Sequence, residues 1–280
     1  MNLPATLQLI RVGNCLMAAA AVWVGSYLTV GFQDSRSLWV VMAGAFVICA
    51  GGNIVNDIID RDADRINHPA RPLPSGRLTL SAAKRVALLC HLGALSMIFI
   101  SNWYVMSLGL LTIVALFTYN LWLKKLPLVG NLLIGILGGL AFLCGGLAVD
   151  PGRALELPGP LMAAIFAVLF HLIREIVKDV EDLEGDGLQQ VRSLGRLIGV
   201  RAALIVALGL LLTLIFLTLV PVWYGWYGEW YLIIVLLLID LPLLGLLVLT
   251  CLRPKRQHIQ WSRAALKIGM LLGLVALLIG

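Results

Sequence analysis

Long apolar stretches, separated by short polar ones, follow one another along the whole chain. They predict nine membrane-spanning helices, at roughly Leu9–Val30, Leu38–Ile59, Val86–Ile100, Val105–Leu123, Val129–Val149, Leu161–Val180, Ala202–Val222, Trp230–Cys251 and Ala264–Leu278. Most of these stretches contain about 20 residues, which is enough to cross the roughly 30 Å of hydrocarbon in a bilayer. The third and ninth are shorter, and we expect both helices to begin earlier. The pattern therefore indicates an all-α, polytopic helical bundle.

The composition agrees with a membrane protein and excludes an ordinary soluble one. Hydrophobic residues make up 60% of the chain and charged residues only 13%. We expect residues 1–280 to form a single transmembrane domain without a separate soluble domain. Two loops, at about 61–85 and 181–201, are long enough to cap one side of the bundle.

The distribution of Lys and Arg predicts the orientation of the helices. If the N-terminus is cytoplasmic, all 21 Lys and Arg residues except Arg36 and Arg153 fall on the cytoplasmic side. This bias is the one that cytoplasmic loops of membrane proteins carry. We therefore expect a multi-pass protein of the cell membrane with both long loops inside and the C-terminus outside. The net charge of +6 then reflects topology and does not indicate nucleic-acid binding.

Two acidic stretches stand out from the apolar background. Residues 56–64 (NDIIDRDAD) and 174–186 (REIVKDVEDLEGD) hold ten of the 15 carboxylates, and each begins near the end of an apolar run. Carboxylates beside a bilayer are costly unless something neutralises them. Mg²⁺ is the neutraliser that suits carboxylate oxygens best.

The spacing within both stretches is that of one helix face. If the first stretch continues the second span, Asn56, Asp60 and Asp64 stand four residues apart, and Lys178, Asp182 and Asp186 repeat that spacing. Like charges so placed repel each other, and cation binding reverses that repulsion. Two such clusters facing each other would hold two or so Mg²⁺ ions around a diphosphate. The cations expected to contact the remaining phosphate oxygens are Arg71, Lys124 or Lys125, Arg174 and Lys178.

Three segments carry a resemblance to a known family. NDIIDRDADRINHPARPLPSG, REIVKDVEDLEGD and YNLWLKKLPLVGNLLIG (119–135) are similar to motifs of the UbiA-type intramembrane prenyltransferases. The resemblance implies a bundle around a central cavity open toward the cytoplasm, where Mg²⁺ holds a prenyl diphosphate. It implies metal ligands at Asn56, Asp60, Asp64, Asp182 and Asp186. It also implies that the four aspartates serve catalysis together with Lys178, which contacts the diphosphate.

Finer features resemble the archaeal-type, ether-lipid-forming branch of that family. These are the REIxKDxED form of the second motif and the INxPxRPLPSG form of the loop. They imply geranylgeranyl diphosphate as donor and the hydroxyl of a prenylglyceryl phosphate, a lipid-like acceptor, as the group alkylated. Many aromatic prenyltransferases of the family have tyrosine where this chain has Arg174. The extra cation would suit an acceptor phosphate, or it could serve the diphosphate.

A few polar residues lie within the predicted spans. Asn14 and Asn131 are candidates for substrate binding or for interhelical hydrogen bonds. His171 precedes Arg174 by about one turn and is a weaker candidate. Asp240 is a mid-span carboxylate and hence a functional candidate. Alternatively, it bonds backbone groups freed by Pro242 or remains protonated.

Other functions stay open at this point. The same reaction could alkylate an aromatic or quinone-precursor acceptor. A divalent-cation transporter is a different class, but its coupled sites usually lie mid-bilayer, whereas these carboxylates are expected at the inner mouth. Nothing in the sequence indicates an obligate protein partner.

Overall fold

The computed structural model describes residues 2–32, 34–183 and 193–280. Its helices, in chain order, are α1 (Leu3–Ile10), α2 (Val12–Val30), α3 (Arg36–Ile59), α4 (Arg61–Asn67), α5 (Leu80–Phe99), α6 (Trp103–Leu121), the 3₁₀ turn η1 (Leu123–Lys125), α7 (Val129–Val149), α8 (Pro160–Glu181), α9 (Leu194–Ile198), α10 (Val200–Trp223), α11 (Glu229–Ile233), the π-helix η3 (Ile234–Asp240), α12 (Leu241–Leu252) and α13 (Arg256–Ile279). Within these ranges no strand occurs.

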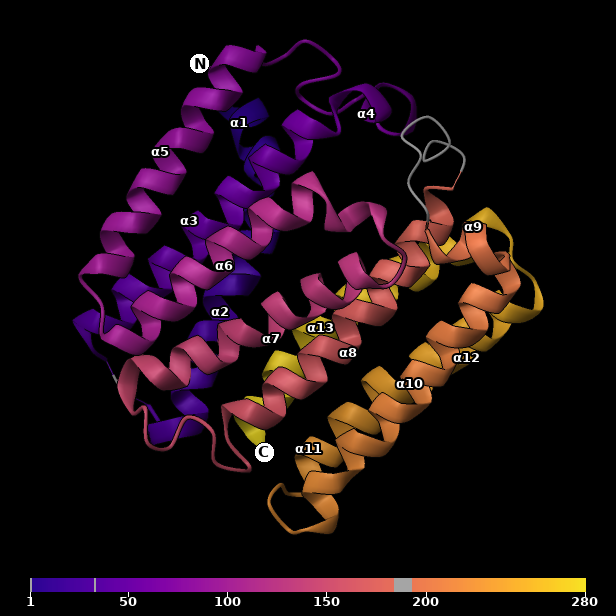
Figure 1. Ribbon diagram of the computed structural model, residues 1–280. Helices are drawn as coiled ribbons and strands as arrows, with labels where there is room; N and C mark the ends of the chain where they lie inside the picture. The colour runs from indigo at the N-terminus through magenta and orange to yellow at the C-terminus, as the bar shows by residue number, and fades with distance from the viewer. Residues whose placement is uncertain (1, 33, 184–192) are drawn as a thin grey trace.

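Nine helical segments in the described part of the chain are long and apolar enough to cross a membrane, as the sequence predicted. They lie side by side in one bundle, with the N-terminus and C-terminus at opposite ends (Figure 1). Helix α7 packs along both α2 and α8, while α10 and α13 cover other sides of α8. Helix α8, which carries the second acidic stretch, is therefore held from several directions.

Several predicted boundaries need correction. The first predicted span is broken at Arg11, whose positive φ of 55° separates α1 from α2. The third and ninth spans begin earlier, at Leu80 and Arg256, as expected. The eighth span contains the π-helix η3 between α11 and α12. Short π segments inside transmembrane helices often accompany functional sites.

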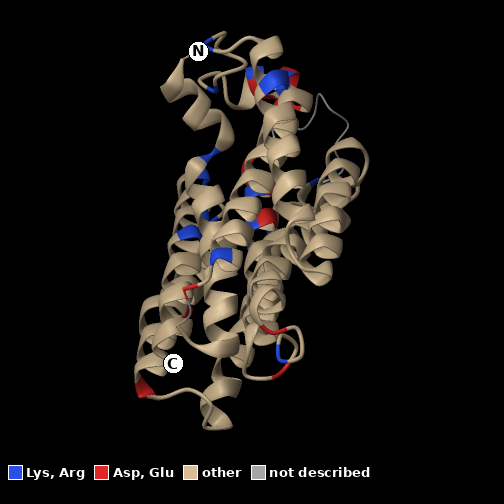
Figure 2. Ribbon diagram, turned by 90° about the vertical axis from the view of Figure 1, so that its left-hand side faces the viewer, with Lys and Arg blue, Asp and Glu red and all other residues tan. Residues whose placement is uncertain are grey.

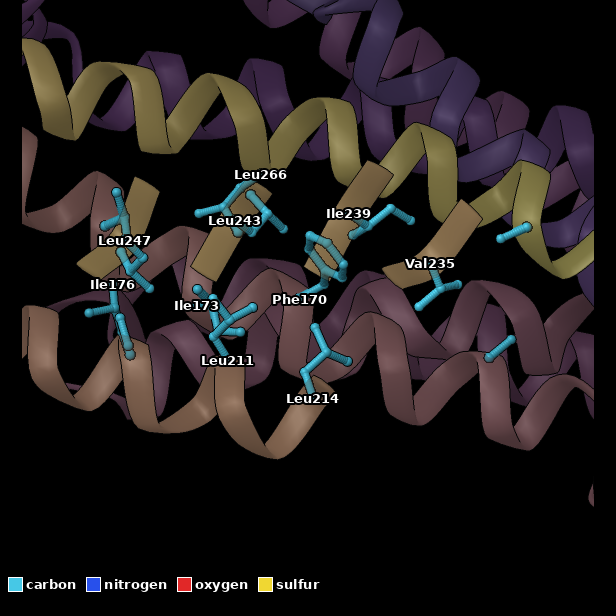
Figure 3. Close-up of a cluster of buried hydrophobic side chains, with 14 of the residues drawn as sticks. Phe170, Ile173, Ile176, Leu211, Leu214, Val235, Ile239, Leu243, Leu247 and Leu266 are labelled. Atoms are coloured by element: carbon cyan, nitrogen blue, oxygen red, sulfur yellow. The ribbon is translucent and has the colours of Figure 1, made fainter. Parts of the chain in front are cut away.

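The main apolar core surrounds α8. Figure 3 shows Phe170, Ile173 and Ile176 of α8 beside residues of α10, α12 and α13. Ile173 and Ile176 are fully buried, as are Leu211 and Leu214 of α10. Side chains that interdigitate in this way leave little room for α8 to rotate or slide. The core thus fixes the direction in which the charged end of α8 presents its side chains.

Glycines allow α2 and α7 to approach each other closely. A Cβ atom added at Gly145 would lie 1.8 Å from the carbonyl oxygen of Val22, and one added at Gly25 would lie 1.9 Å from that of Phe142. Backbone therefore touches backbone along this pair, as small residues permit in membrane helices. This contact brings α2 against the helix that carries Asn131.

We expect Gly145→Ala to destabilise the protein, because its methyl group cannot fit without moving one backbone away from the other. Overpacking of this kind typically costs about 1–3 kcal/mol. The thermal unfolding midpoint of the detergent-solubilised protein should fall by several degrees. Gly209→Ala is the matched control, because Gly209 also lies in a helix but faces open space. Equal midpoints for the two variants would contradict the packing argument.

Candidate active site

The two acidic stretches lie at the same end of the bundle. Figure 2 shows Lys, Arg, Asp and Glu concentrated toward the end that carries the N-terminus, with a few at the opposite end. His68, which follows α4, has its Nε2 atom 3.7 Å from Oδ1 of Asp182, the residue that ends α8. Burial lowers the pKa of His68, and the Arg71 guanidinium lowers it further. The separation of 3.7 Å is longer than a hydrogen bond, and it places the segment that follows the first stretch beside the end of the second.

The first stretch is bent, where the sequence predicted a continuous helix. Helix α3 ends at Ile59, Asp60 lies at φ −86° and ψ 3°, and α4 begins at Arg61. The backbone N–H of Asp60 donates to the Asn56 carbonyl at 2.8 Å, and that of Asp64 donates to the Asp60 carbonyl at 2.8 Å. Backbone hydrogen bonds between residues four apart therefore continue through the bend, although α3 and α4 do not form one straight helix.

Basic side chains hold the carboxylates of this first stretch. The Nη1 atom of Arg71 donates to both oxygens of the buried Asp64 at 2.6 Å. Asp57 is also buried and pairs with Arg11. Lys124 pairs with Asp60. Charges in so apolar a setting are stable only when paired and hydrogen-bonded.

Of the two lysines that the sequence offered as alternatives, Lys124 reaches the site. Its side chain is mostly buried against Asp60, whereas Lys125 is exposed. The 3₁₀ turn η1 places the two consecutive lysines in different directions. The prediction of Arg71 and Lys124 as neighbours of the acidic stretch is consistent with this arrangement, while Lys125 is not brought to it.

The second stretch is organised around a buried carboxylate, Glu175. It accepts a hydrogen bond from Arg174 Nη1 at 2.8 Å and another from Lys178 Nζ at 2.8 Å. Asn131 Nδ2 of α7 donates to Asp179 Oδ2 at 2.9 Å, which is the interhelical bond left open as its alternative role. Asp182 ends α8, and Asp186 lies outside the described residues.

A cavity of about 380 Å³ runs into the bundle from this polar end. Its polar lining includes Asn14, Asn56, Tyr119, Arg174, Glu175 and Lys178. Along α8 the lining extends from Ala163 to Lys178, about 22 Å at 1.5 Å per residue. Tyr119 of α6 therefore lines the same cavity as the charged residues of α8. The predicted central cavity is confirmed.

Comparison with known proteins now identifies the fold and its chemistry. Residues 15–275 match the UbiA prenyltransferase family. The chain belongs to this family. It is therefore an intramembrane prenyltransferase and a multi-pass membrane protein.

Curated relatives in this family cover the chain almost completely. The chain is 35% identical to digeranylgeranylglyceryl phosphate synthase of Methanopyrus kandleri over 277 residues, 98% of each chain. It is 34% identical to the enzyme of that name from Methanococcus maripaludis, covering 100% of this chain and 99% of the relative.

Solved structures of the family share the fold. A structure described as digeranylgeranylglyceryl phosphate synthase in membranes superposes with a TM-score of 0.76 at 32% identity, covering 99% of this chain and 98% of the other. A UbiA homologue from Archaeoglobus fulgidus bound to GPP and Mg²⁺ has a TM-score of 0.62 at 15% identity, covering 98% of this chain and 99% of the other.

The UbiA-family site offers oxygen ligands without a closed metal cage. Among the described residues, no three His, Cys, Asp or Glu side chains converge in the manner of a preformed metal site. Mg²⁺ is usually held by only one or two carboxylates together with substrate phosphates. Asp60 and Asp182, at the ends of α3 and α8, fit that requirement. The donor set therefore suits a hard divalent cation that binds together with a diphosphate.

Several residues of the site were not singled out from the sequence. Glu175 follows Arg174 directly and precedes Lys178 by three residues. That spacing allows salt bridges on a helix and could have indicated its role. Arg11 and His68 reach the site only through the fold. Arg11, for example, is 46 residues away in the sequence from its partner Asp57.

Asp240 is one of the residues that line the cavity. It is buried, and its Oδ2 atom accepts a hydrogen bond from Thr218 Oγ1 at 3.0 Å. Tyr231 donates to the Thr218 carbonyl at 3.1 Å, and all three residues line the cavity. Asp240 is thus bonded to a side chain of α10 and not to backbone freed by Pro242. His171 also lines the cavity, and its Nδ1 atom has no partner in the described part of the chain.

We expect Lys124→Ala to lower kcat/KM by about 100-fold, because the site loses a preorganised positive charge beside Asp60. Lys125→Ala is the matched control, since Lys125 is the next residue and is exposed. It should stay within about twofold of the parent enzyme, as is usual for a surface charge. Steady-state prenyl transfer in membranes measures both. Similar losses in the two variants would exclude a specific role for Lys124.

Proposed function

We propose that this enzyme transfers a geranylgeranyl-type group from its diphosphate to the free hydroxyl of a prenylglyceryl phosphate, with Mg²⁺ as cofactor. The observation that carries the proposal is the cavity, which joins a charged end, beside both acidic stretches, to a long apolar interior. The names of relatives at about one-third identity over the full chain support the choice of donor and acceptor.

The charged end suits a diphosphate. Asn56, Asp60, Asp64 and Asp182 would hold Mg²⁺, and Asp186 would join them from outside the described residues. Bound Mg²⁺ would act as a Lewis acid that stabilises negative charge on the leaving group. Lys178, Arg71 and Lys124 pair with carboxylates in the structure, and in the proposed complex they would exchange these partners for phosphate oxygens. Ionic hydrogen bonds of this kind stabilise charge as it develops.

The reaction exchanges one bond to carbon for another. The bond between C1 of the prenyl group and the diphosphate oxygen breaks, and its electron pair leaves with pyrophosphate. The acceptor hydroxyl oxygen forms an ether bond to C1 and gives its proton to an aspartate or a phosphate oxygen. The apolar walls keep water away from the allylic carbon while it is electron-poor.

The interior of the cavity suits a long isoprenoid chain. Its walls below the charged end are formed largely by Ala, Val, Leu, Ile, Met and Phe side chains of α2, α3, α6, α7 and α8. The roughly 22 Å length along α8, at 1.5 Å per residue, leaves room for an extended prenyl tail. Burial of that tail would contribute binding free energy in proportion to the apolar area removed from water.

We further propose that this site opens to the cytoplasm. All Lys and Arg residues except Arg36 and Arg153 fall on the side of the long loops, which supports a cytoplasmic N-terminus. The C-terminus lies at the other end of the bundle (Figure 1). This orientation can be tested with a reporter that is active only outside the cytoplasm. Fused to the C-terminus, such a reporter should be active.

Asp60→Ala and Asp182→Ala should each lower Mg²⁺-dependent transfer by about 100- to 1,000-fold, because each removes charge stabilisation at the leaving group. The measurement is transfer of labelled geranylgeranyl diphosphate to a prenylglyceryl phosphate, with Mg²⁺ or a chelator. Asp62→Ala is the matched control: its side chain is 85% exposed and pairs only with the neighbouring Arg65 at 3.1 Å among the described groups. It should retain nearly full activity.

The acceptor is tested in the same assay with a panel of compounds. Preference for an aromatic or quinone-precursor acceptor over prenylglyceryl phosphate would reject the proposed acceptor and keep the reaction class. Full activity of both aspartate variants would reject the role of the acidic stretches. Metal uptake into proteoliposomes without any prenyl substrate would favour a transporter instead.

A further inference from the structure

A second cavity adjoins the first one. It measures about 360 Å³ and lies between α8 and α13, where it is lined by Arg174, Glu181, Gln260, Arg263, Ala264 and Lys267. Arg174 and Lys267 also line the main cavity, so the two spaces share these side chains as a common wall. We call this second space the basic pocket.

Positive charge exceeds negative charge in the lining of the basic pocket. Arg263 Nη1 donates to Glu181 Oε2 at 2.7 Å. A single carboxylate, that of Glu175, accepts hydrogen bonds from both Arg174 and Lys178. Three cations (Arg174, Arg263 and Lys267) and one carboxylate, Glu181, line the basic pocket. The lining of this pocket therefore carries two more positive than negative charges. Such an excess favours binding of an anion.

We propose that the basic pocket binds the phosphate group of the lipid acceptor, with Arg174, Arg263 and Lys267 as its contacts. This assignment rests on the proposed function. A phosphate monoester carries a charge of about −1.5 to −2 at neutral pH, which matches the local excess. Arginine offers planar paired donors for phosphate oxygens, and lysine offers a point charge on a flexible stem.

The position of the pocket fits the chemistry of such an acceptor. In the prenylglyceryl phosphate proposed as acceptor, the free hydroxyl and the phosphate stand on neighbouring carbons, so the phosphate must lie close to the hydroxyl oxygen that is alkylated. Arg174 and Lys178 are one turn apart on α8, about 6 Å along the axis. The diphosphate would lie on the Lys178 side and the acceptor phosphate on the Arg174 side. A pocket that shares a wall with the reaction cavity satisfies this requirement.

A purely structural role explains only part of the cluster. The Arg263–Glu181 ion pair ties α13 to α8 and would serve packing by itself. Lys267 is exposed although it lines both cavities. Removing its charge should therefore leave the fold intact while changing what the pocket binds.

The test compares Lys267→Gln with the matched control Arg256→Gln, which lies on the same helix, is exposed and lines neither cavity. Steady-state kinetics of the full chain in detergent micelles are measured with prenylglyceryl phosphate and geranylgeranyl diphosphate varied in turn. We expect Lys267→Gln to raise the acceptor KM about tenfold, the effect of losing one ionic contact, with the donor KM unchanged. Arg256→Gln should change neither constant.

A second acceptor isolates the phosphate. Prenylglycerol, which has the same chain and hydroxyl without the phosphate, should react poorly with the parent enzyme and equally poorly with Lys267→Gln. An unchanged acceptor KM in Lys267→Gln, or a parallel rise of both KM values, would overturn the pocket while leaving the proposed function in place. Failure of the parent enzyme to alkylate any prenylglyceryl phosphate would overturn the proposed function itself, and the pocket with it.

Discussion

Charge compensation at the ends of α3 and α8 is the constraint on which the site depends. A carboxylate beside hydrocarbon is stable only with a partner, and basic side chains pair with carboxylates of both stretches. Asp64 holds Arg71, Asp60 holds Lys124, and Glu175 holds two cations at once. These ion pairs form without any ligand. Under the proposed function, a diphosphate that binds together with a divalent cation would exchange partners with them.

The apolar part of the bundle makes this exchange possible by holding the helix ends in place. Backbone contact between α2 and α7 depends on Gly25 and Gly145, where no side chain fits. The close packing around Ile173 and Ile176 fixes α8 against α10 and α13 (Figure 3). These packing contacts do not involve the charged groups, so they do not depend on which ionic partners those groups have. Rigid elements that carry a polar site are the usual basis of preorganised catalysis.

Much of the fold could be predicted from the sequence, because hydropathy and charge act locally. The nine spans and their order follow from runs of apolar residues that must satisfy their own backbone hydrogen bonds inside a bilayer. Helix breaks were less visible: the pattern of apolar residues predicted neither the interruption at Arg11 nor the π-helix before Leu241. The bend at Asp60 likewise changed a predicted straight helix into two.

The sequence by itself determined which residue types lie at the site, since ten of the 15 carboxylates fall in two stretches at the ends of apolar runs. It also predicted their joint chemistry, because oxygen ligands beside basic groups suit a metal-bound diphosphate. Only the tertiary structure decided the pairings: Lys124 rather than Lys125 reaches Asp60, and Arg11 reaches Asp57 across 46 residues. It also decided that Arg174 and Lys267 stand between two cavities. The physical reason is that composition and spacing act along one helix, whereas ion pairs and cavities depend on how several helices pack together.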